Sequence, residues 1–295
     1  LLAATSHADG FFLAADTPLF IFADGPKPNA STAERERIKA TRELVCSHPW
    51  TRQVTLVESD ENRGLATSIV SGVSRITAEF GRVIVLEDDI ITSPGFLEFM
   101  NRGLELYADD ERVMHVSAYM YPLGLRTRGT VFLRVYSCWG WATWDRAWRH
   151  YDPDVEKHLK RLESPHHLRK FNIEGHGDFR RQLLDNRSGR ICSWAVRWYA
   201  SWLAKGGYTL FPTQSLVRNI GHDGTGVHCV PDDRFDTEPV DAIPVNRIPV
   251  VEHRALRWKI NEFYRTGRGD RTFPRIWLTH RLVLPLQRRL AARFA

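Results

Sequence analysis

The chain has 295 residues, of which 43% are hydrophobic, so it is long enough for one α/β enzyme domain with an appendage and can bury a sizeable core. Its formal net charge is +6, but residues 251–295 carry 11 Lys and Arg against 3 Asp and Glu, which leaves residues 1–250 at about −2. This distribution argues against a nucleic-acid-binding body and predicts no nucleic-acid partner. It predicts instead that the C-terminal segment meets something anionic.

Cysteine spacing and hydropathy indicate the cellular setting. The four cysteines include no CxxC pair, which predicts reduced thiols in a cytoplasmic protein. No run reaches the roughly 18 apolar residues of a membrane-spanning helix. The first 25 residues lack a basic region, so no signal peptide is predicted, and the missing initial Met leads us to expect a start inside a longer gene product.

Strands and helices alternate along the first half of the chain. In order, we predict a strand at 19–22, a capped helix at 31–45, a strand near 53–58, a helix from about Gly64, a strand at 83–86, a helix with Ser93 as N-cap, and a strand within 112–122. This alternation indicates an α/β, Rossmann-like fold, with a mostly parallel sheet flanked by helices. Such sheets bind ligands beyond the carboxyl ends of their strands.

The second half of the chain is less regular. The segment "SCWGWATWDRAW" is rich in Trp, a helix within 193–207 is followed by a short strand at 208–211, and "NIGHDGTGVHC" is a Gly-rich loop. We predict one catalytic domain at 1–235 and a C-terminal extension at 236–295 that contains basic amphipathic helices.

Three carboxylates, Glu87, Asp88 and Asp89, directly follow the buried strand at 83–86. Placing three anions together at a strand end costs free energy unless cations compensate. Carboxylates suit Mg²⁺ or Mn²⁺, which usually take phosphate oxygens and waters as their other ligands. The pattern therefore predicts a divalent-metal site for a diphosphate. The alternative is a solvated acidic turn that caps the next helix.

A series of motifs then points to one family. The motifs "FIFADGPKP", "ENRGLATSIVSGV", "VIVLEDD" with "SPGF", "YSCWGWATWDRAW", "SWAVRWYASWLAKGGYTLFP" and "SLVRNIGHDGTGVHC" occur in this order over about residues 19–229. The chain thereby resembles nucleotide-sugar glycosyltransferases of the GT-A fold, and most closely the N-acetylglucosaminyltransferase I group with its bacterial relatives. The first strand of that family would precede Leu1 and is missing here.

The resemblance implies roles for individual residues. The positions implied to lie against the donor nucleotide are Asp24 at the base, and Asn62, Arg63 and Gly64 beside it. Within the triplet, Asp89 is implied to ligate the metal, Asp88 to lie nearer the ribose and Glu87 near the transferred sugar. In the Gly-rich loop, His222 or His228 is implied to approach the diphosphate or the metal.

Tryptophans offer apolar faces for sugar rings. Trp139, Trp141 and Trp144 are therefore predicted to contact substrate, with core packing as the alternative. Trp194, Trp198 and Trp202 recur every four residues, so we predict that they pack a helix on the sheet. Arg197 lies on another face of that helix and is predicted to reach phosphate, with a surface ion pair as the alternative.

Transfer with inversion needs a general base for the acceptor hydroxyl. The resembled group carries a carboxylate in the helix that matches "SWAVRW", where this chain has none. Asp178 is the first candidate for the base, followed by Glu174, Asp145 and Asp223. The sequence leaves retention of configuration open, although we predict inversion.

The segment 273–294 mixes apolar residues with arginines and is predicted to lie on an anionic membrane surface, with docking on the body as the alternative. These expectations combine into a metal-dependent enzyme of surface polysaccharide biosynthesis at the inner face of the membrane. It would move a sugar from a UDP-sugar to a glycan or a lipid-linked acceptor. A sugar nucleotidyltransferase and a non-catalytic carbohydrate-binding protein are the alternatives.

Overall fold

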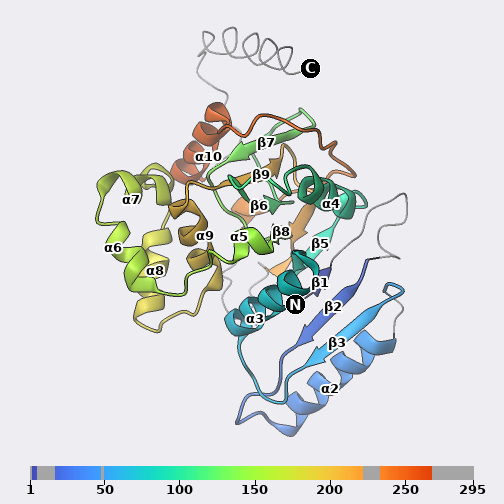
Figure 1. The fold of residues 1–295 in the computed structure, drawn as a ribbon. Coiled ribbons are helices and arrows are strands. Elements are labelled where there is room, and N and C mark those ends of the chain that lie inside the picture. Colours follow the sequence, from blue (N-terminus) through green and yellow to red (C-terminus); the bar gives the residue numbers. More distant parts are fainter. Residues whose placement is uncertain (1, 5–16, 48–49, 222–232, 268–295) are drawn as a thin grey trace.

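The structure is a computed structural model that describes residues 2–4, 17–47, 50–221 and 233–267 (Figure 1). Over these ranges the main sheet has eight strands, in the order β3 (Val54–Glu58), β2 (Leu19–Ala23), β1 (Leu2–Ala4), β4 (Arg82–Leu86), β8 (Trp141–Trp144), β6 (Val113–Ser117), β9 (Tyr208–Pro212) and β7 (Thr130–Leu133). A separate ribbon pairs β5 (Ile90–Thr92) with β10 (Val217–Asn219).

The α/β class is confirmed, but the prediction of a mostly parallel sheet is wrong. The pairings show that β3, β2, β4, β6 and β9 run in one direction, whereas β1, β8 and β7 run the opposite way. The sheet is therefore mixed. The position between β2 and β4 is occupied by β1, which is antiparallel to both neighbours.

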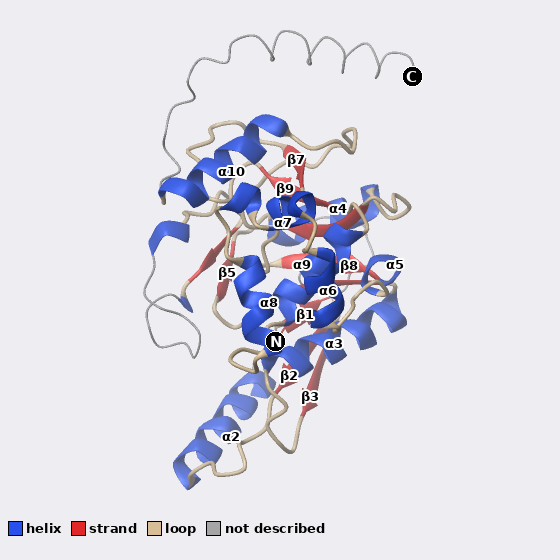
Figure 2. Ribbon diagram, turned by 90° about the vertical axis from the view of Figure 1, so that its left-hand side faces the viewer, coloured by secondary structure: helices blue, strands red, loops and turns tan. Residues whose placement is uncertain are grey.

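Helices surround this sheet. They are α2 (Thr32–Ser47), α3 (Leu65–Phe80), α4 (Phe96–Leu106), α5 (Asp145–Trp148), α6 (Val155–Arg161), α7 (Pro165–Phe171), α8 (Phe179–Arg187), α9 (Trp194–Ala204) and α10 (Arg254–Thr266), with single turns of 3-10 helix at Ile173–Gly175 and Asp233–Phe235. The helix α3 packs on β4, and α4 packs on β8 and β6. Figures 1 and 2 show α6 and α8 gathered beside α9, while α2 and β3 form the far end of the molecule.

Apolar side chains at helical spacing explain where the helices pack. In α3, Ile69, Val73 and Ile76 are fully buried, and they lie on one face of the helix. The helix α9 buries Trp194, Trp198 and Trp202, so the prediction that these three residues pack their helix is confirmed.

Residues 236–267, the described part of the predicted C-terminal extension, pack on the same body. The amide of Gly95 donates to the carbonyl of Asp241 at 2.8 Å, and the amide of Ile248 donates to the hydroxyl of Tyr107 at 2.8 Å. The helix α10 then buries Ile260 and Phe263. The basic segment at 273–294 lies outside the described residues. In the described ranges, no helix has both the length and the apolar character needed to cross a bilayer.

A buried histidine organises the aromatic core. The indole Nε1–H of Trp198 donates to His115 Nδ1 at 3.2 Å, so the proton of the neutral ring lies on Nε2, which donates to the carbonyl of Ser137 at 2.9 Å. The ring also stacks on Trp141, with centroids 5.1 Å apart. Complete burial lowers the pKa of His115 from 6.5 to about 4, because a charged ring would lose its hydration here.

The stability of the fold should therefore fall at mildly acid pH. As the pH falls from 6.5 to 4, His115 binds a proton in the unfolded chain but stays neutral in the folded chain. The free energy of unfolding therefore decreases by roughly 2–3 kcal/mol over this range. We expect His115→Gln to weaken this dependence, because a neutral amide offers one donor and one acceptor without titrating. Urea unfolding of both proteins at pH 7 and pH 4.5 measures the difference, and identical pH slopes would contradict the assignment.

Candidate active site

The predicted site residues lie at one edge of the sheet. Because β2, β3 and β4 share a direction, their carboxyl ends meet at the same edge. Asp24 follows β2, the loop at 59–64 follows β3, and Glu87 to Asp89 follow β4. The fold thus brings together the three stretches to which the resemblance assigned the donor site.

Asp24 holds the two loops of this edge together. Its carboxylate accepts hydrogen bonds from the amides of Gly25 at 2.9 Å, Arg63 at 2.8 Å and Gly64 at 2.9 Å, and from Asn62 Nδ2 at 3.1 Å. All four predicted nucleotide-contacting residues are therefore neighbours. The Asp24 oxygens are occupied by the protein itself, which makes Asp24 a positioning residue for the start of α3.

Two glycines permit this close approach. A Cβ at Gly25 would lie 2.5 Å from the backbone carbonyl carbon of Glu61, so only glycine fits between the two loops. Gly64 has a φ of 77° and directly precedes α3, a conformation that other residues adopt only with strain. Gly25 and Gly64 thereby fix the position of the backbone amides at the start of α3 relative to Asp24.

Asp24→Asn is expected to loosen this edge. An amide has one acceptor oxygen instead of two and brings N–H groups next to other donors, so we expect a loss of about 1–3 kcal/mol in the free energy of unfolding. Hydrogen exchange at residues 62–65 should also become faster. Asp60→Asn is the matched control, because Asp60 is exposed on the same loop. Equal protection in the two variants would contradict the role given to Asp24.

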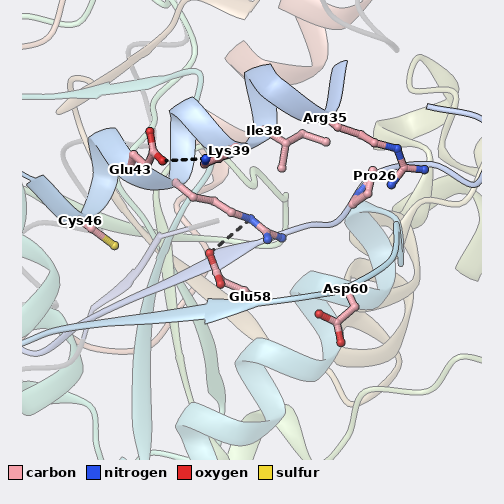
Figure 3. A pocket seen from close by; sticks show the side chains of 9 residues that line it. Pro26, Arg35, Ile38, Lys39, Glu43, Cys46, Glu58 and Asp60 are labelled. Atoms are coloured by element: carbon pink, nitrogen blue, oxygen red, sulfur yellow. Dashed lines mark ion pairs between the residues drawn. The ribbon is translucent and has the colours of Figure 1, made fainter. Parts of the chain in front are cut away.

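Two pockets flank α2 beside this edge. One, of about 390 Å³, is lined by Asp24 and Asn62 together with the basic residues Lys27, Arg37 and Arg42. The other, of about 530 Å³, shares Arg42 with the first and is lined further by Glu58 (Figure 3). Cationic side chains thus lie beside two of the residues predicted to contact the nucleotide.

Arg42 also fixes the strand ends. Its Nη2 donates to the carbonyl of Ser59 at 2.7 Å and to that of Asp24 at 3.2 Å, and its Nε lies 3.5 Å from the Glu58 carboxylate, as the dashed line in Figure 3 shows. These contacts tie the end of β2 to the end of β3. Sequence analysis missed Arg42, whose only signal was an arginine within a helix rich in charged residues.

The three carboxylates differ in environment. Glu87 is half-buried, and its carboxylate accepts no hydrogen bond from the described residues. Its pKa is raised to about 7, first because burial disfavours the charge and then because Asp89 and Asp88 are close. Asp88 is exposed, and Asp89 is half-buried. Three carboxylates are therefore concentrated at the end of β4.

A second segment is bound to Asp89. Asn219 Nδ2 donates to Asp89 Oδ2 at 3.0 Å, and the amide of Ile220 donates to the Asp89 carbonyl at 2.9 Å. A Cβ at Gly221 would lie 2.6 Å from Asp89 Oδ2, so glycine is required for this packing. The antiparallel pairing of β10 with β5 creates the contact. Sequence analysis missed Asn219, although the "RNIGHDG" run contains it.

The Gly-rich loop continues from this segment. His222, Asp223 and His228 lie outside the described residues, so their predicted roles remain predictions. Where the structure describes the chain, no three His, Cys, Asp or Glu side chains form a metal-binding group. This arrangement is compatible with Mg²⁺ or Mn²⁺, because such ions are commonly held by one or two carboxylates together with substrate phosphates.

A cluster of aromatic side chains follows Cys138 near the triplet. Cys138 is half-buried, and its pKa is raised to about 12 by desolvation and by the nearby charges of Glu87 and Asp89. The next residue, Trp139, is half-buried, and its ring meets that of Tyr119 edge-on at 4.6 Å and that of Phe235 at 6.1 Å. The chain next to Trp139 therefore passes near the carboxylates.

The other two predicted sugar-contacting tryptophans are core residues. Trp141 is fully buried and stacks on Trp194 at 5.1 Å, while Trp144 is buried and donates from Nε1 to the carbonyl of Leu104 at 3.0 Å. The prediction that these two contact substrate is therefore wrong. Both belong to β8, a strand buried along its whole length, which the sequence analysis had read as a ligand platform.

The base candidates lie apart from one another. Asp178 is exposed at the start of α8 and accepts from Gln182 Nε2 at 2.9 Å. Glu174 forms an ion pair with Arg169. Asp145 pairs with Arg149 at 2.6 Å, and its amide donates to the carbonyl of Gly81. Gly81 precedes β4, so Asp145 is at the edge of the sheet away from the triplet, and its candidacy as the base is wrong.

Asp178 lies near a group of tyrosines. Its charge acts on Tyr264, whose hydroxyl lies 3.2 Å from that of Tyr121. Tyr121 donates to the carbonyl of Tyr136, whose own hydroxyl is close enough to feel the charge of Glu87. Asp178 therefore lies near Tyr264, and its role as the general base remains a prediction.

Arg197 makes only short-range contacts in the structure. Its Nε donates to the carbonyl of Ser193 at 2.9 Å, and its Nη2 approaches Cys192 Sγ at 3.7 Å. No carboxylate pairs with it among the described residues, so the surface ion pair considered as an alternative is not formed. Contact with phosphate remains a prediction.

In comparisons with known proteins, no family model and no curated protein matches this chain. The function of the protein is therefore inferred from the chemistry of the site and from the motifs.

Proposed function

We propose that the protein is a metal-dependent glycosyltransferase of the GT-A fold, which moves a sugar from a UDP-sugar to a glycan or a lipid-linked acceptor with inversion. One observation carries this proposal. The Glu87–Asp89 carboxylates end β4 at the same sheet edge at which Asp24 holds the loop that starts α3. A site for a metal-bound diphosphate and a site for its nucleoside are thereby adjacent.

The start of α3 supplies the part of the proposed donor site that binds the anionic phosphates. The amides at a helix N-terminus carry partial positive charge and suit phosphate groups. Gly64 leaves this helix end without a side-chain cap, and Asp24 holds the preceding amides in place. The adjoining pocket of about 390 Å³, with Lys27 and Arg37 in its wall, adds cationic character next to Asn62.

The carboxylate triplet supplies the part of the proposed donor site that binds the metal ion. Asp89 would hold Mn²⁺ or Mg²⁺, and Asn219 keeps one of its oxygens oriented. When bound, the ion would stabilise the negative charge of the departing nucleoside diphosphate. Glu87 is proposed to lie near the transferred sugar, and Asp88 nearer the ribose.

The acceptor side is proposed to include Trp139 and Asp178. Trp139 presents an indole near the triplet, where a sugar ring can stack on it. Asp178 remains the first candidate for the general base, because its carboxylate is exposed at the start of α8. Glu174 is a weaker candidate, since it already pairs with Arg169. We also keep the proposal that residues 273–294 attach the enzyme peripherally to the inner face of an anionic membrane.

A panel of nucleotide-sugars tests the reaction. Slow hydrolysis of a UDP-sugar to UDP and free sugar, dependent on Mn²⁺ or Mg²⁺, is the expected result, because water replaces the acceptor. Pyrophosphate release from a nucleoside triphosphate and a sugar phosphate would indicate a nucleotidyltransferase instead. Binding of free sugar without nucleotide or metal dependence would indicate a carbohydrate-binding protein. Either of these results would refute the proposal.

A further inference from the structure

A pocket of about 440 Å³, distinct from the two beside α2, lies among α6, α7 and the C-terminal end of α9. Gly206, which lines it, lies two residues before the start of β9. Because β9 is parallel to β6, and β6 to β4, the start of β9 lies at the sheet edge opposite to the carboxyl end of β4. This pocket is therefore separate from the Glu87–Asp89 site, and its ligand is independent of the proposed glycosyl transfer.

The lining of this pocket is basic. It contains Arg134, His158, Arg161, His166, His167 and Lys170, and no Asp or Glu of the described ranges lines it. Phe171 and Leu162 add an apolar floor. The exposed Arg161 and Lys170 form no ion pair with a described carboxylate, so their charges are available to a ligand.

Arg134 is held rigidly at the back of this pocket. Its guanidinium lies over the ring of Tyr208, 4.2 Å from the centroid, and its Nη2 donates to the Tyr208 hydroxyl at 2.8 Å. Its Nε is buried and has no hydrogen-bond partner in the described part of the chain. A positioned guanidinium with a free donor is the group that proteins most often use to bind phosphate.

Helix dipoles explain part of this arrangement. Arg161 and Lys170 lie in the last turns of α6 and α7, where cations interact favourably with the terminal carbonyl groups. Dipoles do not explain why a pocket of this size lacks carboxylates. The neighbouring pocket on α6 shows the contrast, because there Lys157 and Lys160 share the lining with Asp154, Glu156 and Glu163.

We propose that the basic pocket at the start of β9 binds a phosphate group, carried either by a soluble phosphorylated compound or by a lipid headgroup. A phosphate accepts several charge-assisted hydrogen bonds at once, and three permanent cations converge here. The volume of about 440 Å³ accommodates a phosphate with a small attached group.

Calorimetry with inorganic phosphate and with pyrophosphate tests this proposal. The titrations contain EDTA and little salt, so that the metal-dependent site stays silent. Arg161→Gln combined with Lys170→Gln is expected to weaken binding at least tenfold, since two charge-assisted hydrogen bonds to the phosphate are lost. Lys160→Gln is the matched control, because it removes one charge from the same helix but lines the neighbouring pocket. We expect it to change the affinity less than about twofold.

Vesicle sedimentation distinguishes the two sources of phosphate. Weaker sedimentation of the double variant with phosphatidylglycerol vesicles, relative to Lys160→Gln, identifies a lipid headgroup. Unchanged sedimentation together with weaker binding of soluble phosphate identifies a soluble compound, and either result supports the proposal. Absence of phosphate binding by the unmodified protein, with equal sedimentation of all variants, would overturn it.

Discussion

Asp89→Asn is expected to lower the rate of metal-dependent hydrolysis of the nucleotide-sugar by at least about a hundredfold. The neutral amide is a poorer ligand for a hard divalent ion, and a bound metal contributes several kcal/mol to stabilising the leaving diphosphate. The fold should survive, because the amide oxygen can still accept from Asn219. The initial rate at saturating Mn²⁺ is the measurement.

Asp109→Asn is the matched control for this variant. Asp109 is exposed on the turn before β6, and therefore lies at the opposite edge of the sheet from the triplet. The Asp109→Asn variant makes the same chemical change and should leave the hydrolysis rate unaltered. Hydrolysis by Asp89→Asn at the rate of the unmodified protein would remove Asp89 from the site.

Trp141→Ala is expected to destabilise the fold by about 3–5 kcal/mol, because it leaves a large cavity in a close-packed core. The indole is fully buried between His115 and Trp194, with both ring centroids at 5.1 Å. Urea unfolding monitored by circular dichroism measures the loss. Trp141→Phe should cost much less, since it keeps an aromatic ring and removes an indole N–H that has no partner among the described residues.

Trp139→Ala provides the functional contrast. The side chain is half-buried near the triplet, so its removal should cost about 1–2 kcal/mol of stability. It should also raise KM for the sugar acceptor once that acceptor is known, because a stacking surface is lost. A larger loss of stability for Trp139→Ala than for Trp141→Ala would contradict the division between a core tryptophan and a site tryptophan.

Local patterns predicted the regular elements that have a strong signal of their own. The expected strands at 19–22, 83–86 and 208–211 correspond to β2, β4 and β9. The expected helices at 31–45 and from about Gly64 correspond to α2 and α3. The helix predicted to start at Ser93 starts at Phe96 instead, since Gly95 is its N-cap.

The antiparallel strands had no such local signal. Residues 141–144 are buried on both faces of β8, so the alternation of apolar and polar residues that marks a half-buried strand is absent. β5 and β10 contain three residues each and exist only because segments about 130 residues apart in the chain pair with each other. Long-range pairing of this kind cannot be derived from local periodicity.

The same distinction applies to the site. The carboxylate triplet was evident because three acids follow an apolar strand, and its neighbours in "FADGP" and "ENRGLA" were found through the resemblance. Asn219 and Arg42 were missed, because their importance comes from contacts made in three dimensions with Asp89 and with the ends of β2 and β3. Trp141 and Trp144 were misassigned, since composition does not separate a buried tryptophan from a stacking one.

The central claim is that the triplet and the loop held by Asp24 together bind a metal-complexed nucleoside diphosphate. Calorimetric titration of UDP into the unmodified protein and into Asp89→Asn, each with Mn²⁺ and with EDTA, tests it most directly. We expect UDP to bind tightly only to the unmodified protein in the presence of Mn²⁺. Equal affinity in all four titrations, or no binding in any of them, would contradict the claim.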